Sequence, residues 1–354
     1  MTDTDRHTKP SESKRYLWIV LPPVVLVLLM LLAAAWLFWW PNRFDAPEKI
    51  VRVYRGALFH AIVDSLESAG VITNRTSFEL AGRVLGLTDR IKFGRYRITS
   101  GMSNLAIYRD LTEGLSNEPI AVRIVEGARM HHVAGRLGSE LGVDSSLIAA
   151  LCVDPEFINS LGIKAPSLEG YLLPDTYRFS WQTDEAELVR SLVKSFQDFY
   201  VDSLKARQER LGMTVNEVLT LASIVEGETS LDAERATIAG VYFNRLRARM
   251  PLQADPTIQY IIPDGPRRLF YSDLKINSPY NTYRNPGLPP GPINNPSRQS
   301  ILAVLYPEKH QYYFFVADGT GGHKFSRNYS EHQRAVRNWR KIRQDQQARN
   351  NASG

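Results

Sequence analysis

The sequence lacks cysteine almost completely, since Cys152 is the single one among 354 residues. One thiol excludes an internal disulfide, and no set of cysteine, histidine and carboxylate residues has the spacing of a zinc site. Cys152 stands in an apolar run, which predicts a small buried core residue. The sequence therefore indicates no disulfide framework, no bound metal and no cofactor.

Excess charge is also absent from most of the chain. The net charge is +6, but the segment from Arg327 to the end alone holds seven basic and two acidic residues. Residues 17–326 are neutral overall, so the high pI reflects a basic C-terminal end and argues against a nucleic-acid-binding body. Residues 344–354 are expected to form a basic polar tail. The hydrophobic content of 44% excludes a disordered or fibrous chain.

Long hydrophobic runs are missing except for one at the start. Leu17–Trp40 contains 24 residues without a charge, which exceeds the roughly 20 needed to cross a bilayer. A signal peptide cleaved near Ala33–Ala35 is the alternative, but the apolar run continues past that point and ends in two tryptophans, as at a membrane interface. Lys14 and Arg15 precede the run, which predicts a cytoplasmic tail at residues 1–16 and places the remaining chain across the membrane.

A sequence repeat follows residues 41–49, which are expected to form a short polar linker. The segment Val51–Ala57 recurs as Val122–Ala128 at an offset of 71 residues, and a weaker third copy begins at Tyr96. Each copy predicts a short strand, a turn at glycine and an amphipathic helix. Because so small a unit cannot bury its own apolar face, we expect the copies to pack together in one compact α+β module over residues 50–160.

The remaining part, residues 161–343, is expected to form a mixed α/β domain. Helical patterns there are interrupted by residues 167–177, which have no clear period, and by a long polar loop at residues 277–296. Loops of that length are usually functional or disordered. The absence of low-complexity repetition favours an ordered binding loop.

Glu226 stands out in the helix expected over Val215–Thr229. It lies on the same apolar stripe as Val218 and Ala222. A buried carboxyl is costly as an anion, and a protonated carboxyl near neutral pH is what a general acid requires. The residues alone leave a second interpretation open, in which Glu226 is a structural carboxylate paired with a buried arginine or a helix N-terminus.

Ordered motifs between about Leu17 and Tyr329 resemble the YceG-like family of endolytic murein transglycosylases. In chain order these motifs are Glu169–Tyr177 (EGYLLPDTY), Leu221–Thr229 (LASIVEGET), Leu252–Thr257 (LQADPT), Tyr280–Tyr283 (YNTY), Gly287–Ile293 (GLPPGPI), and Phe315–Gly319 with Gly321–Phe325. The catalytic glutamate of the family lies in the ASIVE motif, which corresponds to Glu226. Gly227 departs from the family pattern, in which a charged residue is common.

The resemblance implies an N-terminal anchor, a LysM-like glycan-binding module and a catalytic domain on the periplasmic side of the bacterial inner membrane. It implies cleavage of the MurNAc–GlcNAc bond within nascent glycan strands, leaving 1,6-anhydro-MurNAc ends, during cell wall assembly. Its implied partners are glycan strands and cell-wall synthases, the penicillin-binding proteins, and they include no nucleic acid. The substrate-binding residues that we assign beside it are Glu169, Asp175, Tyr177, Ser223, Gln253, Asp255, Asn281, Thr282 and Tyr283.

Two other functions stay open at this stage. A hydrolytic muramidase normally needs a second carboxylate, for which Glu169, Asp175, Asp255 and Glu228 are available. A non-catalytic scaffold would use the repeat module to dock other proteins of wall synthesis. The polar residues of the long loop have a structural alternative as well, which is to hold the loop through side-chain turns. His323, in a Gly-Gly-His sequence, suits a loop closure.

Overall fold

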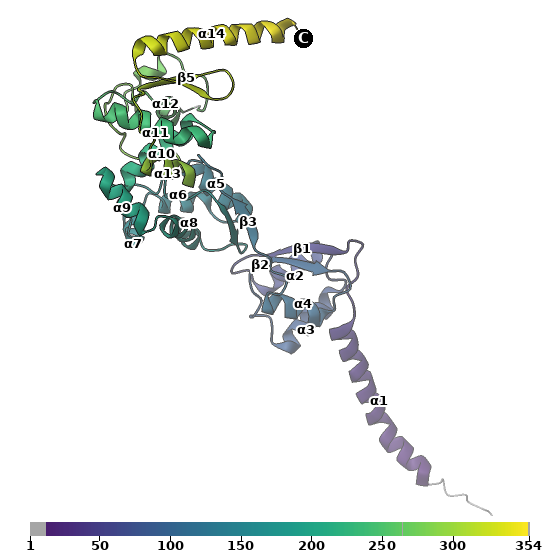
Figure 1. Cartoon of the computed structure of the whole chain (residues 1–354). Coiled ribbons are helices and arrows are strands. Elements are labelled where there is room, and N and C mark those ends of the chain that lie inside the picture. Colours follow the sequence, from purple (N-terminus) through teal and green to yellow (C-terminus); the bar gives the residue numbers. More distant parts are fainter. Residues whose placement is uncertain (1–11, 264, 353–354) are drawn as a thin grey trace, which may run out of the picture. The chain divides into compact units, whose positions relative to one another are not determined.

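The computed structural model describes residues 12–263 and 265–352 of the chain. Over these residues the protein is a mixed α+β structure, as expected, and it divides into two compact units (Figure 1). Unit 1 comprises the residues up to Ile120 together with Ser180–Gln182, and unit 2 comprises Ala121–Phe179 and the residues from Thr183 onward. Most of the expected cytoplasmic tail, residues 1–11, lies outside the described residues.

Helix α1 (Glu12–Trp39) opens the described part of the chain. It includes one stretch, Val20–Trp39, that is long and apolar enough to cross a membrane by length and composition. The residues from 20 to 33 are all exposed. Near its C-terminal end α1 meets the rest of unit 1, where Leu37 is buried in the core and Phe38 packs against it.

Unit 1 is built on a two-stranded antiparallel sheet. Strand β1 (Glu48–Val53) pairs with β2 (Gly94–Thr99), so that Glu48 lies opposite Thr99 and Val53 opposite Gly94. Between the strands the chain forms α2 (Phe59–Ser68) and α3 (Arg75–Leu85), and α4 (Asn104–Glu113) follows β2. Alternate residues of both strands point into one core, whose buried side chains include Val51, Val53, Leu66, Phe78, Tyr96, Ile98, Tyr108 and Leu111.

The three copies of the repeat do not form one module, so that expectation was wrong. The first and third copies supply β1 and β2 of unit 1, but the second copy, which forms β3 (Ile120–Arg123) and α5 (Met130–Leu141), belongs almost entirely to unit 2. There β3 pairs with β4 (Thr176–Phe179). A strand–turn–helix pattern specifies local structure only, and the partner strand is chosen by the tertiary fold. The unit boundary therefore falls at Ile120, forty residues before the expected end of the module at residue 160.

The segment expected to be a linker, residues 41–49, is instead part of unit 1. The backbone N–H of Asn42 donates to Met102 O at 2.9 Å, and its side-chain oxygen accepts from the backbone of Thr73 at 2.9 Å. The backbone N–H of Phe44 donates to Ser100 Oγ at 3.0 Å. Since β1 already begins at Glu48, the segment has too many fixed contacts to act as a hinge.

Unit 2 is mainly helical, with two small sheets at its periphery. Helix α10 (Val215–Glu228) lies at its centre and contacts α9 (Asp202–Leu211), α11 (Asp232–Arg247), α12 (Asp255–Ile261) and α13 (Arg298–Leu305). The elements that follow α5 are α6 (Ser145–Leu151), α7 (Pro155–Ser160), β4, α8 (Glu185–Phe199), α9 (Asp202–Leu211), α10 (Val215–Glu228), α11 (Asp232–Arg247), α12 (Asp255–Ile261), η1 (Asp273–Lys275), α13 (Arg298–Leu305), β5 (Phe314–Ala317), β6 (His323–Ser326) and α14 (Tyr329–Ala352). Cys152, at the end of α6, is buried as expected.

Helix α10 begins as its sequence predicts. Thr214 is the N-cap, and its side chain and that of Glu217 bond reciprocally to each other's backbone, which is a capping box. Every residue from Val218 to Val225 is buried. The helix is therefore surrounded by protein, whereas the apolar stripe in the sequence predicted burial of one face.

The C-terminal end is helical where a basic polar tail was expected. Helix α14 continues to Ala352, and residues 353–354 lie outside the described residues. It packs against β5 and β6, and Trp339 and Ile342 line a cavity together with Phe325 of that hairpin. These apolar contacts explain why the basic segment is ordered as a helix near the hairpin.

Candidate active site

Glu226 lies in the last turn of α10 with its side chain 7% exposed. Its Oε2 accepts hydrogen bonds from the backbone N–H of Ser297 at 2.9 Å and from Ser297 Oγ at 2.5 Å. The same oxygen lies 3.2 Å from Nη1 of Arg235. Ser297 is the N-cap of α13, so this oxygen is held both by a helix N-terminus and by a cation.

Arg235 is itself almost fully buried, and it comes from α11. Its Nε donates to Asp232 at 2.8 Å, and Nη1 donates to Ser300 Oγ at 2.6 Å. The structure therefore realises the pairing that the sequence left open, with both a buried arginine and a helix N-terminus. Arg235 stands on the buried stripe of α11 with Ile238 and Ala239, so helical periodicity also marks Arg235 as a buried charge, without showing that it pairs with Glu226.

The second oxygen of Glu226 has different surroundings. Among the described residues none donates a hydrogen bond to Oε1 or forms an ion pair with it. The loop at Gly127 passes close by, and a Cβ at Gly127 would lie 3.6 Å from Cγ of Glu226. Glu226 is thus anchored through one oxygen, which leaves the other as the atom that can exchange a proton with a ligand.

Glu228 lies two residues further on, where the helical twist turns it to another face of α10. Its Oε1 accepts a hydrogen bond from the hydroxyl of Tyr242 at 2.5 Å. Burial, with a smaller contribution from the charge of Asp255, raises the pKa of Glu228 to about 7. The carboxyl of Glu228 is therefore partly protonated near neutral pH.

A cavity of about 270 Å³ opens beside Glu228. It brings together three of the expected substrate-binding residues, Gln253, Asp255 and Tyr283, and Tyr283 donates from its hydroxyl to Asp255 Oδ1 at 2.5 Å. Arg245 also lines the cavity, and its guanidinium donates to the carbonyls of Tyr313 and Leu252, both at 2.7 Å. Aromatic side chains that the sequence analysis missed complete the wall; they are Tyr242, Phe314, Phe315 and Tyr329, with His332 beside them.

Three other expected substrate-binding residues are buried and bonded to backbone. Ser223 Oγ donates to Thr220 O at 2.7 Å and accepts from the backbone of Ile293 at 3.0 Å. Asn281 donates to the carbonyls of Leu274 and Ile276 at 3.0 and 2.8 Å, and Thr282 Oγ1 accepts from the backbone of Ala254 at 3.0 Å. These contacts hold the long loop in place, which was the structural alternative for its polar residues.

The remaining three expected residues belong to the segment 169–177. Glu169 Oε1 accepts from the backbone of Met130, the first residue of α5, at 2.8 Å, and burial raises the pKa of Glu169 to about 7. Tyr177 donates to Leu173 O at 2.6 Å. Asp175 is exposed and pairs with Arg298 at 2.9 Å. Arg298 directly follows Ser297, the partner of Glu226, in the chain.

His323 closes the β5–β6 hairpin onto α11. Its Nδ1 lies 2.7 Å from Glu234 Oε2, and its backbone N–H donates to Glu234 Oε1 at 2.8 Å. Over residues 12–263 and 265–352 there is no group of three or more histidine, cysteine and carboxylate side chains that could hold a metal ion. The residues described at the site supply carboxylates, hydroxyls, the guanidinium groups of Arg235 and Arg245, and aromatic rings.

Comparison with known proteins gives relatives over most of the chain. A Bacillus subtilis (strain 168) protein named endolytic murein transglycosylase is 33% identical over 301 residues, which cover 80% of this chain and 83% of that protein. A Streptococcus pneumoniae R6 protein of the same name is 30% identical over 320 residues, which cover 81% of this chain and 57% of that longer protein. The crystal structure of a yceG-like protein from Listeria monocytogenes matches with a TM-score of 0.59 at 31% identity, covering 82% of this chain and 99% of that one.

These relatives define the class of protein. The chain is an enzyme of the lytic transglycosylase class, as the similarity to proteins of that name over about four fifths of its length indicates. The sequence profile described as the YceG-like family matches residues 51–338. The chain belongs to the YceG-like family, and the resemblance seen in its motifs is confirmed.

Proposed function

We propose that this protein is a membrane-anchored endolytic transglycosylase that cleaves the MurNAc–GlcNAc bond within nascent peptidoglycan strands and leaves 1,6-anhydro-MurNAc ends. The relatives named endolytic murein transglycosylase support the substrate class. The observation that carries the catalytic assignment is the asymmetry of Glu226. One of its oxygens is fixed by Ser297 and Arg235, and the other has no donor among the residues that the structure describes.

In the proposed reaction Glu226 acts first as an acid and then as a base. Its Oε1 protonates the glycosidic oxygen as the bond from that oxygen to C1 of MurNAc breaks. The C6 hydroxyl of the same sugar then attacks C1, and its proton returns to Glu226, so no water is consumed. Between the two steps Glu226 is an anion beside a positively charged sugar, and the donors on Oε2 hold that anion in place for electrostatic stabilisation.

We assign the cavity beside Glu228 to a neighbouring sugar of the strand. A volume of about 270 Å³ lies just below the usual range of ligand sites, about 300–1,000 Å³, which suits one sugar ring better than an extended chain. Asp255 and Gln253 can bind hydroxyl and N-acetyl groups, and Phe314 offers an aromatic face. Glu169, Asp175, Tyr177, Ser223, Asn281 and Thr282 then support the site through their contacts with the protein.

The layout of the chain fits action close to the inner membrane. We propose that Val20–Trp39 spans the bilayer with the N-terminus in the cytoplasm, and that unit 2 acts on the periplasmic side. Unit 1 is proposed as a LysM-like glycan-binding module, because two helices lie between the paired strands β1 and β2. Glycan strands and penicillin-binding synthases are the proposed partners.

Product analysis with the variant Glu226→Gln tests this function. The substitution keeps the size of the side chain and removes its transferable proton, so turnover should fall by about 10²–10⁴-fold. The matched control is Glu209→Gln, at an exposed position of α9, and it should leave turnover unchanged. The wild-type enzyme should cut purified glycan strands internally and leave 1,6-anhydro ends.

Labelled water separates the two alternatives from the proposal. Incorporation of ¹⁸O at new reducing ends would assign the protein to the muramidases, with Glu228, Asp255, Glu169 or Asp175 as the second carboxylate. Failure of the folded wild-type protein to cut strands that it binds would favour the scaffold. Full activity of Glu226→Gln would reject Glu226 as the acid.

A further inference from the structure

The end of α1 is built into unit 1 without a hinge. Leu37 is a member of the unit 1 core, and Phe38 packs against that core. The side-chain amide of the buried Asn104, at the start of α4, donates to the carbonyl of Leu37 at 2.9 Å and accepts from Asn42 Nδ2 at 3.0 Å. The direction of α1 relative to unit 1 is therefore fixed by side-chain packing and by a buried hydrogen bond.

This attachment overlaps with the apolar stretch of α1. Val20–Trp39 has 20 residues, and at about 1.5 Å per residue these span roughly the 30 Å of a hydrocarbon core. Leu37 and Phe38 lie in the last turn of that stretch and in the core of unit 1 at once. If α1 spans the bilayer, the part of unit 1 that packs around them must lie at the depth of the lipid headgroups.

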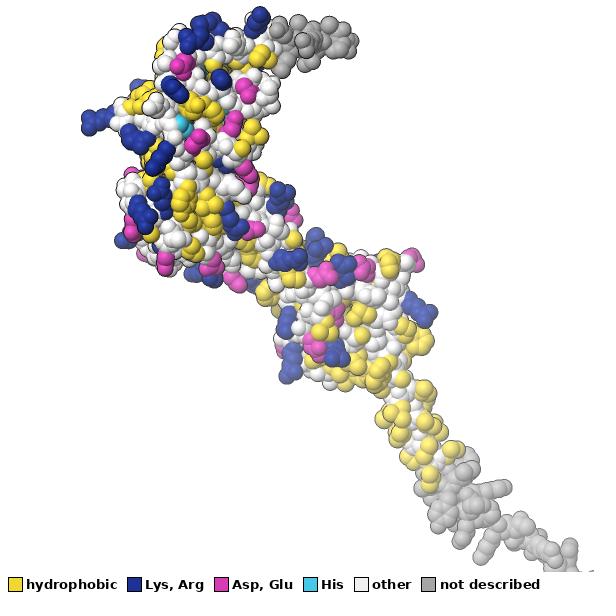
Figure 2. Space-filling model, viewed as in Figure 1, with side chains coloured by type: hydrophobic (Ala, Val, Ile, Leu, Met, Phe, Trp, Pro, Cys, Tyr) yellow, Lys and Arg dark blue, Asp and Glu magenta, His cyan; other side chains and the backbone are white. Residues whose placement is uncertain are grey.

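Helices α3 and α4 both contact α1, and of the two it is α3 that carries exposed large apolar side chains. In Figure 1 α3 lies on the side of unit 1 from which α1 departs, away from the sheet. Leu80 and Val84, one turn apart on α3, are 51% and 62% exposed. In Figure 2 hydrophobic side chains gather on unit 1 close to the upper end of α1. A helix with two large apolar side chains on its outer face is suited to an interface between lipid and water.

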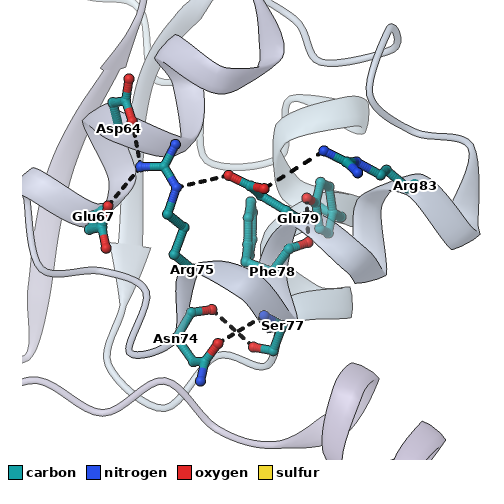
Figure 3. Close-up of polar contacts among 9 residues, drawn as sticks. Asp64, Glu67, Asn74, Arg75, Ser77, Phe78, Glu79 and Arg83 are labelled. Atoms are coloured by element: carbon teal, nitrogen blue, oxygen red, sulfur yellow. Dashed lines mark hydrogen bonds and ion pairs between the residues drawn. The ribbon is translucent and has the colours of Figure 1, made fainter.

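The two arginines of α3, Arg75 and Arg83, differ in their ion pairs, as Figure 3 shows. Arg75 is enclosed by carboxylates, with Asp64 at 2.5 Å and Glu67 and Glu79 both at 2.9 Å. Arg83 is 71% exposed, and its ion pair with Glu79 is long, at 3.8 Å, because Glu79 already binds Arg75. Arg83 is therefore available to an anion outside the protein, next to Val84.

We propose that the outer face of α3, formed by Leu80, Arg83 and Val84, lies in the membrane surface, with the two apolar side chains among lipid chains and Arg83 on a lipid phosphate. This inference rests on the proposed membrane span of α1. It adds a second lipid contact, which fixes the orientation of unit 1 on the bilayer. Without this contact α1 and unit 1 could still tilt together in the bilayer, as one body.

Fluorescent labels on single introduced cysteines can test the contact in the full chain. The protein is reconstituted in vesicles of phosphatidylcholine and phosphatidylglycerol that carry nitroxide-labelled lipids. Cys152 is buried and the burial raises the pKa of its thiol to about 12, so thiol dyes react with the new cysteine. The probe positions are Leu80→Cys and Val84→Cys, and Leu115→Cys is the control because Leu115 is 68% exposed just beyond the far end of α4.

For dyes at positions 80 and 84 we expect fluorescence emission shifted to the blue and strongly quenched by the lipid nitroxides. A dye at position 115 should show neither effect. A label at Leu28, in the middle of α1, reports the membrane span independently. Quenching at 28 without quenching at 80 and 84 would overturn the α3 contact and leave the anchor intact. Absence of quenching at all positions would overturn both the contact and the proposed span.

A charge reversal tests the role of Arg83 separately. Arg83→Glu should reduce the quenching at position 84, and the reduction should be larger in vesicles rich in phosphatidylglycerol. The matched control is Arg109→Glu, since Arg109 is similarly exposed on α4 and also pairs with a glutamate four residues away. Equal quenching at position 84 in the labelled parent protein, in Arg83→Glu and in Arg109→Glu would show that Arg83 does not bind a lipid phosphate. Reduced quenching with the control variant alone would overturn the assignment of Arg83.

Discussion

Arg235 and Glu226, from the consecutive helices α11 and α10, form an ion pair at 3.2 Å in which both side chains are nearly inaccessible to solvent. The pair uses only one oxygen of the carboxylate. Breaking a buried pair by removing one partner is strongly destabilising, because the other charge is left uncompensated. The pair therefore joins the proposed chemistry of Glu226 to the stability of unit 2.

Replacement of Arg235 by glutamine should affect both stability and turnover. We expect the free energy of unfolding to fall by about 3–5 kcal/mol, and turnover per folded molecule to fall because the carboxylate loses its fixed position. Denaturant unfolding and glycan cleavage measure the two effects, with Arg210→Gln on exposed α9 as the control. The double variant with Glu226→Gln should recover part of the lost stability. Unchanged stability of Arg235→Gln would contradict the buried pair.

Gly56 and Gly127 form a natural matched pair for a second prediction. They occupy the same place in two copies of the repeat and have φ values of +72° and +71°. Alanine at either position should cost roughly 1–2 kcal/mol, because residues with a Cβ rarely adopt this conformation. Nothing lies within 4 Å of a Cβ at Gly56, whereas one at Gly127 would contact Glu226.

Only the variant Gly127→Ala should therefore lose glycan-cleaving activity beyond its loss of stability. Activity assays at a temperature where both variants are fully folded check this difference. Equal activities of the two variants would mean that the Gly127 loop does not bear on Glu226.

Glu228 predicts a pH dependence of stability. The pKa of its carboxyl is raised from 4.5 to about 7 by burial, so the folded protein holds this proton more tightly than the unfolded chain. The contribution of Glu228 to the free energy of unfolding is fully present below about pH 4.5. It is lost as the pH rises through about 7, and the loss is up to about 3 kcal/mol. Glu228→Gln should flatten the decline over that range, as followed by unfolding at several pH values. Identical profiles for the variant and the wild type would contradict the raised pKa.

Asn295 should be the most sensitive amide in unit 2. Its side-chain oxygen accepts from the backbones of Gly170 and Leu172 at 2.9 and 3.0 Å, and its Nδ2 donates to Ala128 O at 2.9 Å and to Glu169 at 3.2 Å. Asn295→Ala leaves several buried groups without partners, at about 1–3 kcal/mol each. We expect a large fall in the melting temperature. The control is Asn159→Ala, at an exposed position of α7.

The parts of the fold that sequence predicted are those set by local pattern. The start of α10 at Thr214 follows from its capping residues, and the burial of Cys152 follows from the apolar run around it. The long loop at residues 277–296 is ordered, and Asn281 is completely buried in it. The first two features are decided by residues within a few positions of them, whereas the loop also depends on distant partners such as Ser223.

The parts that sequence missed depend on partners far along the chain. The second copy of the repeat pairs with β4, some fifty residues later, and not with the other copies. Ser297, which holds Glu226, is 71 residues away from it. Periodicity predicted that Glu226 would be buried, but the identity of the groups around it is set by tertiary packing, so its pairing with Arg235 could not be derived from the stripe alone.

The placement of Leu37 has a consequence for any proteolytic release of the protein from α1, its proposed anchor. Proteolysis after Trp40 would remove a side chain from the core of unit 1, and with it the carbonyl that Asn104 binds. Loss of a buried leucine side chain costs about 2–5 kcal/mol, so the released fragment would be less stable than the same residues in the intact chain. Proteolytic release of the fragment after Trp40 therefore favours unfolding of unit 1, and we expect the released fragment to be short-lived.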